Sequence, residues 1–501
     1  MTMMPRELWT AAQVRELDRR AIEEEGIPAR ELMERAGLAA LEALRRGWPA
    51  ARDVTVLCGG GNNGGDGYVL ARRAREQGWQ VRVLALADPA GLDGDAAAAC
   101  TDYRQAGGAV ESWHEGDVLP GTGPLVDGLL GTGLDRPLEG RYAAAVEALN
   151  GSGRPVLALD IPTGLHADTG RELGIAVRAA LTVCFIGLKL GLFTGRGRAC
   201  AGEVTFAGLH VPPGLAAGLE PAARRLDPRQ LAHWLPRRDR DAHKGRFGHV
   251  LVLGGDYGMG GAALLAGRAA LRAGAGLVTV ATRPEHAAAM FAAQPELMCR
   301  GVSEPADLEP LLARATVVAA GPGLGQAPWG QALLAAALAS DLPCILDADA
   351  LNLLSEHPRA PGRWIITPHP GEAARLLDTG PGEVEADRPA ALRALRERYR
   401  CVVVLKGAGT LVAGQGAVPW LCDAGNPGMA SGGMGDVLTG LAAGLAAQLH
   451  DLERAACAGV LVHALAADDA ARRGERGLAA GDLLDCLHGW VNPGDDADLP
   501  A

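Results

Sequence analysis

Aromatic residues make up only 4% of this chain of 501 residues, and lysine occurs only as Lys189, Lys244 and Lys406. No long basic run offsets the net charge of -11, which argues against a nucleic acid or an anionic membrane as partner. The N-terminus has no apolar core of the signal-peptide type, and no stretch reaches membrane-spanning length without charged or turn residues. We therefore expect a cytoplasmic protein without nucleic-acid or membrane partners.

Several familiar motifs are also missing. The chain has no G-x-x-x-x-G-K-[S/T], which excludes a P-loop, and no acidic residue closes the strand after its first glycine-rich loop in the manner of dinucleotide-binding folds. The ten cysteines form no C-x-x-C and have no neighbouring histidine cluster. Zinc and disulfides are therefore not expected, and the cysteines are expected to be small buried residues. The chain does have a hydrophobic fraction of 48%, which at this length is enough for two or three domains.

The first third of the chain alternates predicted strands and helices. A buried strand over 54–57 runs into the loop 58–67, CGGGNNGGDG, before a predicted helix from Tyr68 to about Gln77 and a strand over 81–85. This βαβ layout places a ligand at the carboxyl edge of a parallel sheet. The glycines leave backbone N–H groups accessible, and the asparagines and the aspartate add amide and carboxylate contacts.

Two later strands of this region end in an aspartate. Residues 125–127, LVD, lead into GLLGTGLDRP, and residues 156–160, VLALD, lead into IPTG. An aspartate at the end of a buried strand is where open α/β sheets build their sites, although either residue could instead cap a loop. Lys189, after a predicted strand over 181–185, either joins this site or is an ordinary surface lysine.

The second half of the chain also has predicted buried strands that run into loops with glycine or polar residues, but the loop sequences differ from those of the first third. A segment rich in proline, glycine and alanine over 211–225 places the domain boundary near residue 220. Beyond it, predicted strands over 250–253, 316–320, 344–347, 364–367 and 401–405 all end in glycine or polar residues. This pattern predicts a large ligand site at the edge of a mostly parallel sheet with helices on both faces. Asp347 and Asp349 either position magnesium there or have a structural role.

The stretch from Asn426 to Asp436, NPGMASGGMGD, precedes a long apolar helical pattern. Glycines before a helix let backbone N–H groups converge at its partly positive N-terminus, which suits an anion such as phosphate. Asp436 then places a carboxylate in the first turn, where it can act as a base on a hydroxyl beside the phosphate. The alternative is a glycine-rich turn with a helix-capping aspartate.

Taken in order, these motifs resemble a known pair of enzymes. G-x-G-N-N-G-G-D-G, D-x-x-x-G-T-G and D-I-P-T-G are similar to the NAD(P)H-hydrate epimerase family. The strand-end K-G-x-G-T and the later G-x-G-D resemble the ribokinase superfamily, and within it the ADP-dependent NAD(P)H-hydrate dehydratase, which is often fused to that epimerase. The resemblance covers nearly the whole chain. It implies a Rossmann-like three-layer α/β sandwich over 1–220 and a ribokinase-like α/β/α domain over 221–501.

For the first domain, the resemblance implies interconversion of the R and S hydrates of NADH and NADPH, called NADHX and NADPHX, at ring carbon C6. Asp160 would be the acid/base residue, since epimerising a carbinolamine requires proton transfer rather than a nucleophile. Asn63, Asp127 and Thr163 would bind a potassium ion, with threonine where the family often has serine. The residues implied to bind the hydrate are Asn62, Asn63, Gly64, Gly65, Asp66, Gly131, Thr132, Gly133, Leu134, Asp135, Arg136, Pro137 and Asp160.

For the second domain, the resemblance implies phosphorylation of the S hydrate's hydroxyl from ADP with Mg²⁺, followed by loss of phosphate to regenerate NAD(P)H. Phosphate is a far better leaving group than hydroxide. Asp436 would be the base, and Ala262, Gly323, His369 and Asp436 would bind the hydrate. The residues implied to bind the nucleotide are Lys406, Gly407, Ala408, Gly409, Thr410 and Gly435.

Two other functions share parts of this pattern. A ribokinase-like kinase for a vitamin-precursor alcohol, fused to a nucleotide-binding domain without turnover, would also need the anion site and Asp436. It would leave the GNNGGDG loop unexplained. The first domain could instead bind a nucleotide or a protein partner without catalysis, which the presence of Asp160 and of the ion ligands disfavours. The sequence does not decide whether ADP or ATP is the phosphoryl donor. We also expect the chain to form a homo-oligomer.

Overall fold

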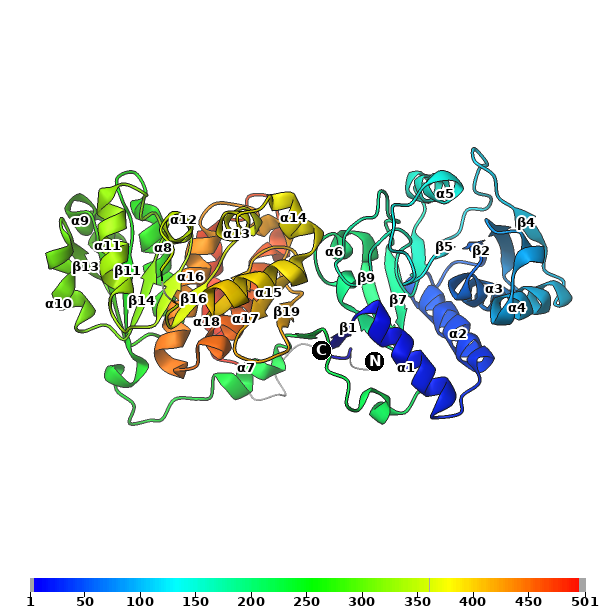
Figure 1. Cartoon of the computed structure of the whole chain (residues 1–501), viewed down its shortest axis with the longest axis horizontal. Helices are drawn as coiled ribbons and strands as arrows, with labels where there is room; N and C mark the ends of the chain where they lie inside the picture. Colours follow the sequence, from blue (N-terminus) through cyan, green and yellow to red (C-terminus); the bar gives the residue numbers. More distant parts are fainter. Residues whose placement is uncertain (1–3, 360, 495–501) are drawn as a thin grey trace. The chain divides into compact units, whose positions relative to one another are not determined.

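The computed structural model of the chain describes residues 4–359 and 361–494. By its internal contacts the chain divides into two compact units, Met1–Arg224 (unit 1) and Arg225–Ala501 (unit 2). Each unit has its own sheet and its own helices (Figure 1). Among the described residues, no helix is both long and apolar enough to cross a membrane.

The main sheet of unit 1 is entirely parallel, with strand order β4-β3-β2-β5-β6-β7-β9. The order reverses between β2 and β5, so loops at their carboxyl ends diverge and leave room for a ligand. The strands are β2 (Asp53–Cys58), β3 (Gln80–Ala85), β4 (Val110–Ser112), β5 (Leu125–Gly128), β6 (Val156–Leu159), β7 (Leu181–Phe185) and β9 (Glu203–Ala207). The short strand β1 (Glu7–Trp9) pairs in parallel with β8 (Leu188–Lys189) and antiparallel with β10 (Ala223–Arg225).

Helices cover both faces of this sheet and make three layers. Successive strand residues alternate between two buried clusters, with Val56 in one and Leu57 in the other, as the two-residue period of a strand requires. The first cluster includes α1 (Ala11–Glu23), α2 (Ala29–Gly47), α3 (Asn62–Glu76) and α4 (Gly94–Gln105), and the second includes α5 (Gly140–Gly151). The short α6 (Gly197–Ala201) precedes β9. The predicted three-layer sandwich is confirmed.

One boundary that matters for the site differs from the prediction. The sequence predicted the helix after β2 to begin at Tyr68, but α3 begins at Asn62. Its glycines allow close packing rather than an open loop, since a Cβ on Gly64 would lie 2.2 Å from the carbonyl oxygen of Gly59. The GNNGGDG segment is therefore the first two turns of a helix, and its polar side chains project from a rigid element.

The sheet of unit 2 is parallel from β13 to β17 and ends in two antiparallel strands, in the order β13-β12-β11-β14-β15-β16-β17-β18-β19. The strands are β11 (His249–Leu253), β12 (Leu277–Thr282), β13 (Met298–Gly301), β14 (Val317–Ala320), β15 (Cys344–Leu346), β16 (Trp364–Ile366), β17 (Val402–Leu405), β18 (Thr410–Ala413) and β19 (Trp420–Cys422). Here the order reverses between β11 and β14, which makes that pair the switch point of unit 2.

One face of the unit 2 sheet packs on α8 (Gly260–Arg272), α16 (Met434–Leu449), α17 (Leu452–Ala470) and α18 (Ala480–Trp490). The small residues of these helices bring backbones close, as at Gly440, where a Cβ would lie 2.0 Å from the Ala266 carbonyl oxygen. The remaining helices of the unit are α7 (Arg229–Trp234), α9 (Pro284–Ala293), α10 (Glu309–Leu312), α11 (Pro328–Leu338), α12 (Asp349–Glu356), α13 (Pro370–Leu377), α14 (Pro381–Ala386) and α15 (Arg388–Tyr399). The mostly parallel α/β/α domain predicted here is confirmed.

Candidate functional site

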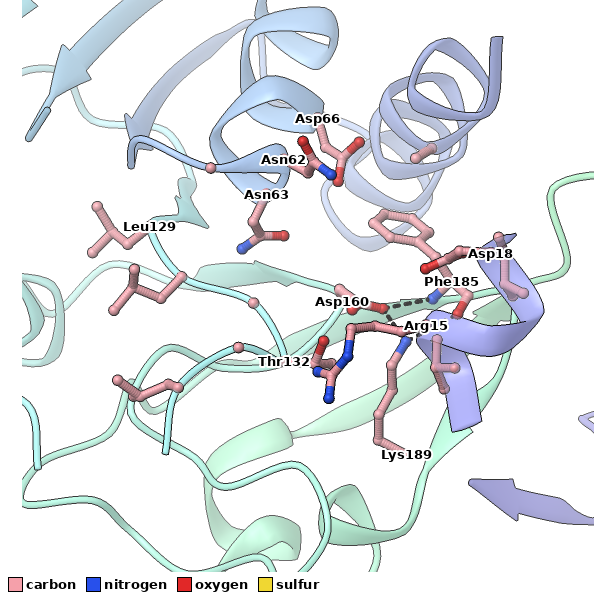
Figure 2. Close-up of a pocket in the computed structure, with 18 of the residues that line it drawn as sticks. Arg15, Asp18, Asn62, Asn63, Asp66, Leu129, Thr132, Asp160, Phe185 and Lys189 are labelled. Atoms are coloured by element: carbon pink, nitrogen blue, oxygen red, sulfur yellow. Dashed lines mark hydrogen bonds and ion pairs between the residues drawn. The ribbon is translucent and has the colours of Figure 1, made fainter. Parts of the chain in front are cut away.

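Unit 1 contains a cleft of about 1090 Å³ at the carboxyl ends of its strands. Its walls come from α1, from the first turns of α3, from the loop after β5 and from the ends of β6 and β7. Figure 2 shows Asn62, Asn63 and Asp66 facing Asp160 and Lys189 across this space. The volume is large enough for a ligand of dinucleotide size.

Asp160 directly follows β6 and has a left-handed backbone, with φ at 66°. This conformation is uncommon for a residue other than glycine, and such strain concentrates at functional sites. Its backbone N–H donates to the Val183 carbonyl oxygen at 2.8 Å, and its Oδ1 accepts from the backbone N–H of Phe185 at 3.1 Å. Both bonds fix the Asp160 carboxylate against the end of β7.

Lys189 is the main partner of Asp160. Its Nζ donates to Asp160 Oδ1 and to the Phe185 carbonyl oxygen, the latter at 3.0 Å, and its side chain is completely buried. Burial alone would lower the pKa of Lys189, but the neighbouring Asp160 carboxylate outweighs burial and raises it. Lys189 is therefore a buried ammonium paired with Asp160, and the alternative of an ordinary surface lysine is excluded.

Two further carboxyl groups share the cleft. Burial raises the pKa of Asp66 well above its usual range, and the charges of Asp160 and Asp18 raise it further. Burial also raises the pKa of Asp18, to about 6, with Lys189 lowering it and Asp160 raising it. None of the described residues donates a hydrogen bond to the carboxyl of Asp66. Burial and the neighbouring negative charges therefore both favour the protonated form of Asp66.

Asn63, Asp127 and Thr163 are the residues predicted to bind potassium, and of these Asn63 lines the cleft while Asp127 and Thr163 bond to each other. Asp127 is fully buried, accepts from the backbone N–H of Thr163 at 2.8 Å and from its hydroxyl at 2.7 Å, and burial raises its pKa to about 6. The amide of Asn63 is also buried, and neither its oxygen nor its nitrogen has a partner. A Cβ on Gly131 would lie 4.0 Å from Asn63 Oδ1. An unpaired amide oxygen near a buried carboxylate suits a monovalent cation, whose charge would offset that of Asp127.

The structure brings together most of the epimerase residues that the sequence singled out. The residues that line the cleft are Asn62, Asn63, Asp66, Gly131, Thr132, Gly133, Leu134, Asp135, Arg136, Pro137 and Asp160. Gly64 and Gly65 are buried within α3 and do not line it, and Asp127 and Thr163 lie behind it. Asn63 is thus the predicted ion ligand that also lines the cleft.

In unit 2, Asp436 occupies the first turn of α16, after the left-handed Gly433 with φ at 90°. Burial raises the pKa of Asp436 from 3.8 to about 6, with the Asp347 charge raising it further and Lys406 opposing the rise. None of the described residues donates a hydrogen bond to its carboxylate. Asp436 therefore has the free lone pairs and the raised proton affinity that a general base needs.

Lys406 and Asp347 form a buried ion pair beside Asp436. Lys406 Nζ lies 2.6 Å from Asp347 Oδ1, which also accepts from Thr367 at 2.8 Å, while Thr439 donates to Oδ2 at 3.0 Å. Burial alone would raise the pKa of Asp347, but the Lys406 ammonium outweighs it and the pKa is lowered. A Cβ on Gly435 would lie 3.2 Å from Asp347 Oδ2 and 3.5 Å from Lys406 Nζ, so the absence of a side chain there leaves space around this pair.

The residues predicted to bind the hydrate in unit 2 fall into two groups. Gly323 follows β14 and has φ at 59°. It lies against Met259 and Ala262 at the switch point, where a Cβ on Gly323 would lie 3.3 Å from the Ala262 Cβ. His369 instead caps α13, where its Nδ1 accepts from the backbone N–H of Gly371 at 2.9 Å. Its side chain is half exposed, and burial lowers its pKa, so it is neutral at pH 7.

The loop predicted to bind the nucleotide, 406–410, joins β17 to β18. Its glycines Gly407 and Gly409 have φ at 140° and 70°. Arg388, at the start of α15, is fully buried, and its Nη2 donates to the carbonyl oxygens of Leu405 and Lys406 at 3.2 and 3.1 Å and to that of Gly409 at 3.4 Å. One guanidinium therefore holds both ends of the loop.

Sequence reasoning missed three side chains of these sites. Arg15 and Asp18 reach the unit 1 cleft from α1, and Arg388 braces the unit 2 loop from α15. A polar position near the apolar stripe of α1 was the available signal for Asp18, which lies next to the buried Leu17. Arg388 gave no signal, because arginine is common throughout the chain. In the described part of the chain, no three His, Cys, Asp or Glu side chains gather as metal ligands.

Comparison with known proteins gives matches to both units. A family model described as NAD(P)H-hydrate dehydratase matches residues 250–488, and one described as YjeF-related protein N-terminus matches residues 29–191. A bifunctional NAD(P)H-hydrate repair enzyme of Coxiella burnetii is 49% identical, over 97% of this chain and 99% of that protein. One of Escherichia coli is 44% identical, over 98% and 95% respectively. A ribokinase-like superfamily protein of Enterococcus faecalis has a similar structure, with a TM-score of 0.51 and 30% identity over 54% of this chain and 95% of its own.

Proposed function

The chain belongs to the family of bifunctional NAD(P)H-hydrate repair enzymes, and we propose that its two activities are divided between its two units. Unit 1 interconverts the R and S hydrates of NADH and NADPH at C6. Unit 2 dehydrates the S hydrate to NAD(P)H at the expense of ADP. We assign the epimerase to residues 1–220 and the dehydratase to residues 221–501, which the boundary between the compact units after Arg224 supports.

One observation carries this division: each unit gathers its motif residues around a partly buried carboxylate at the carboxyl edge of its own sheet. These carboxylates are Asp160 in unit 1 and Asp436 in unit 2. Proton transfer at a hydroxyl is the step that both activities need, and a positioned carboxylate supplies it. The surroundings of the two differ, because Lys189 holds Asp160, whereas Asp436 has no such partner.

In unit 1, Asp160 accepts the proton of the hydrate's C6 hydroxyl and later returns it. Lys189 and the backbone N–H of Phe185 fix the orientation of Asp160 throughout. The N-terminus of α3 and the loop 131–137 hold the rest of the hydrated dinucleotide. The partial positive charge of the helix N-terminus and its free backbone N–H groups suit the pyrophosphate.

Potassium fits the group formed by Asn63, Asp127 and Thr163. Asn63 offers the unpaired amide oxygen, and Asp127 offers a buried carboxylate. Bound there, the ion would supply positive charge to offset the Asp127 carboxylate. The chain's own contribution is to fix the loop after β5, since the Thr163 hydroxyl accepts from the backbone N–H of Leu130 at 3.0 Å.

In unit 2, Asp436 accepts the proton of the S hydrate's hydroxyl as its oxygen attacks the terminal phosphoryl group of ADP. The N-terminus of α16 stabilises the transferred phosphoryl group. Loss of phosphate from C6 and of a proton from C5 then regenerates NAD(P)H. The hydrate lies near Ala262, Gly323, His369 and Asp436, with His369 limited to a neutral binding role.

We propose that the nucleotide binds along residues 406–410 and Gly435, and that Mg²⁺ bound with it would offset the negative charge of its phosphates. Lys406 is held by Asp347 and lies 3.7 Å from Glu372, so it acts from a fixed position rather than as a mobile arm. Both carboxylate oxygens of Asp347 accept hydrogen bonds, and Asp349 accepts from the backbone N–H of Gly325 at 2.8 Å. This supports a positioning role for the two aspartates.

The remaining parts of the proposal concern the setting of the enzyme. We place it in the cytoplasm, with no nucleic-acid or membrane partner, and none of its ten cysteines, all of them among the described residues, forms a disulfide, as in a reducing compartment. We also propose a homo-oligomer, which light scattering of the purified chain would test.

The direct test supplies a mixture of R and S NADHX with Mg²⁺, K⁺ and either ADP or ATP, and follows the near-ultraviolet absorbance of NADH. We expect recovery past the S fraction to near completion. Asp436→Asn should abolish recovery, and Asp160→Asn should stop it at the S fraction once uncatalysed exchange is subtracted. Absence of recovery with either nucleotide would refute the proposed function.

A further inference from the structure

The cleft of unit 1 contains more carboxyl groups than one acid/base residue requires. Asp18, Asp66 and Asp160 all line it, together with one buried ammonium, that of Lys189. Lys189 pairs directly with Asp160 and also donates to the Phe185 carbonyl oxygen. Within the described residues, no cation lies at hydrogen-bonding distance from either of the other two carboxyl groups.

We propose that Asp66 is a second catalytic residue of the epimerase: a general acid that donates a proton to the ring nitrogen N1 while Asp160 removes the proton from the C6 hydroxyl. This inference rests on the epimerase function proposed for unit 1. It assigns a role in the chemistry to a residue that the sequence placed only in hydrate binding.

The position of Asp66 supports this role. It lies in the second turn of α3, a rigid helix, and its side chain faces the cleft opposite Asp160 (Figure 2). None of the described residues donates a hydrogen bond to it, so its carboxyl is free to contact a ligand. The opposed placement lets two carboxyl groups act on two atoms of a ring held between them.

The charges around Asp66 keep its proton in place. The titratable and charged side chains that line the cleft with it are Arg15 and Asp18 from α1, Asp95 from α4, Asp135, Arg136, Glu139 and Tyr142 from the segment after β5, and Asp160 and Lys189 from the strand ends. Because Lys189 is paired with Asp160, ionising Asp66 would add a further negative charge to those of Asp160 and Asp18. Burial raises the pKa of Asp66 well above its usual range, and these two charges raise it further. A pair of carboxyl groups with opposite protonation provides both an acid and a base at one pH.

The reaction balances with these two groups. The Asp160 carboxylate takes the hydroxyl proton, the C6–O bond becomes a carbonyl, and the C6–N1 bond breaks with its electron pair moving to N1. N1 takes the proton of Asp66, which leaves a ring-opened aldehyde between two residues of exchanged protonation. After rotation about the C5–C6 bond, N1 attacks the other face of the carbonyl and returns its proton to Asp66. The new hydroxyl takes the proton from Asp160, and no oxidant or second substrate is needed.

The test measures epimerisation alone, in the full chain without nucleotide, by chromatographic separation of R and S NADHX from a pure R start. Asp66→Asn keeps the size and the polarity but cannot donate an acidic proton. We expect kcat to fall about 10²-fold or more with little change in KM, the usual contribution of a general acid. Asp66→Glu should recover part of the rate. Asp93→Asn removes an exposed carboxyl at the start of α4, outside the cleft, and is the matched control, with an expected loss of less than about threefold.

The pH profile gives a readout that a structural role would not change. The wild-type rate should fall at alkaline pH as Asp66 loses its proton, and this fall should persist in Asp93→Asn. If Asp66→Asn does not fold, the wild-type and Asp93→Asn profiles decide the question by the presence or absence of that fall. Wild-type activity with an unchanged rate in Asp66→Asn, or with no alkaline fall, would overturn this inference alone. A wild-type chain that does not interconvert R and S would overturn the epimerase function as well.

Discussion

Replacing Asp436 with asparagine should stabilise unit 2 at the same time as it abolishes dehydration. The pKa of Asp436 is raised from 3.8 to about 6, chiefly by burial and then by the Asp347 charge. A carboxyl whose folded pKa is raised weakens the fold once it ionises, because the unfolded chain carries the same charge in water. A rise of this size corresponds to about 3 kcal/mol at neutral pH, at about 1.4 kcal/mol per pH unit.

The sign and the pH range follow from the same shift. Stability is lost as the pH rises from the unfolded pKa of 3.8 to the folded value of about 6, and the asparagine variant lacks this loss. The variant should therefore be more stable than the wild type by up to about 3 kcal/mol at pH 8. At pH 5, linkage with these two pKa values predicts that the difference in the free energy of unfolding between the variant and the wild type is about 1.4 kcal/mol smaller than at pH 8.

The assay is urea unfolding of the full chain, with hydrogen exchange of peptides from α16 as the readout. This readout assigns the unfolding transition to unit 2. Asp341→Asn is the matched control, because Asp341 lies on an exposed loop, and its stability should change by less than about 0.5 kcal/mol. An asparagine variant that is less stable than the wild type at pH 8, or a gap that does not depend on pH, would refute this reasoning.

Three further predictions concern the partners of the two sites. Lys189→Met leaves the partly buried Asp160 charge without its ion pair and should destabilise unit 1 by about 3 kcal/mol in urea unfolding. It should also slow R-to-S exchange at least about tenfold while dehydration of pure S hydrate is unchanged. Arg388→Met removes the donor to three loop carbonyls, so the KM for ADP in the dehydration assay should rise, with destabilisation of about 3 kcal/mol. Thr163→Val removes the hydroxyl donor to Asp127, and exchange of K⁺ for a bulky organic cation should then have less effect on epimerisation than in the wild type.

Much of the fold could be predicted from local patterns. In unit 2, the strands β11, β14, β15, β16 and β17 each end where glycine or a polar residue follows, as the sequence predicted. The family resemblance drawn from the glycine-rich motifs is confirmed by relatives that span nearly the whole chain. The start of α3 could not be predicted, since glycines that permit close helix packing look the same in sequence as glycines that form a loop.

The candidate sites were predicted as far as strand ends could place them. Asp160 and Asp436 follow a strand and open a helix respectively, so topology alone brings them to the carboxyl edges of the two sheets. Lys189 and Arg388 depend on contacts between segments far apart in sequence, and Arg388 in particular carries no motif. The raised proton affinities of Asp66 and Asp436 depend on burial and on neighbouring charges, which exist only once the chain has folded.

The most direct test of two complementary sites in one chain is complementation in solution. Pure R NADHX is supplied with ADP, Mg²⁺ and K⁺ to Asp160→Asn alone, to Asp436→Asn alone, and to an equimolar mixture of the two variants. We predict that each variant alone recovers NADH no faster than uncatalysed exchange allows, and that the mixture restores complete recovery. Full recovery by either single variant, or none by the mixture when the wild type is active, would contradict the division of epimerisation and dehydration between Asp160 in unit 1 and Asp436 in unit 2.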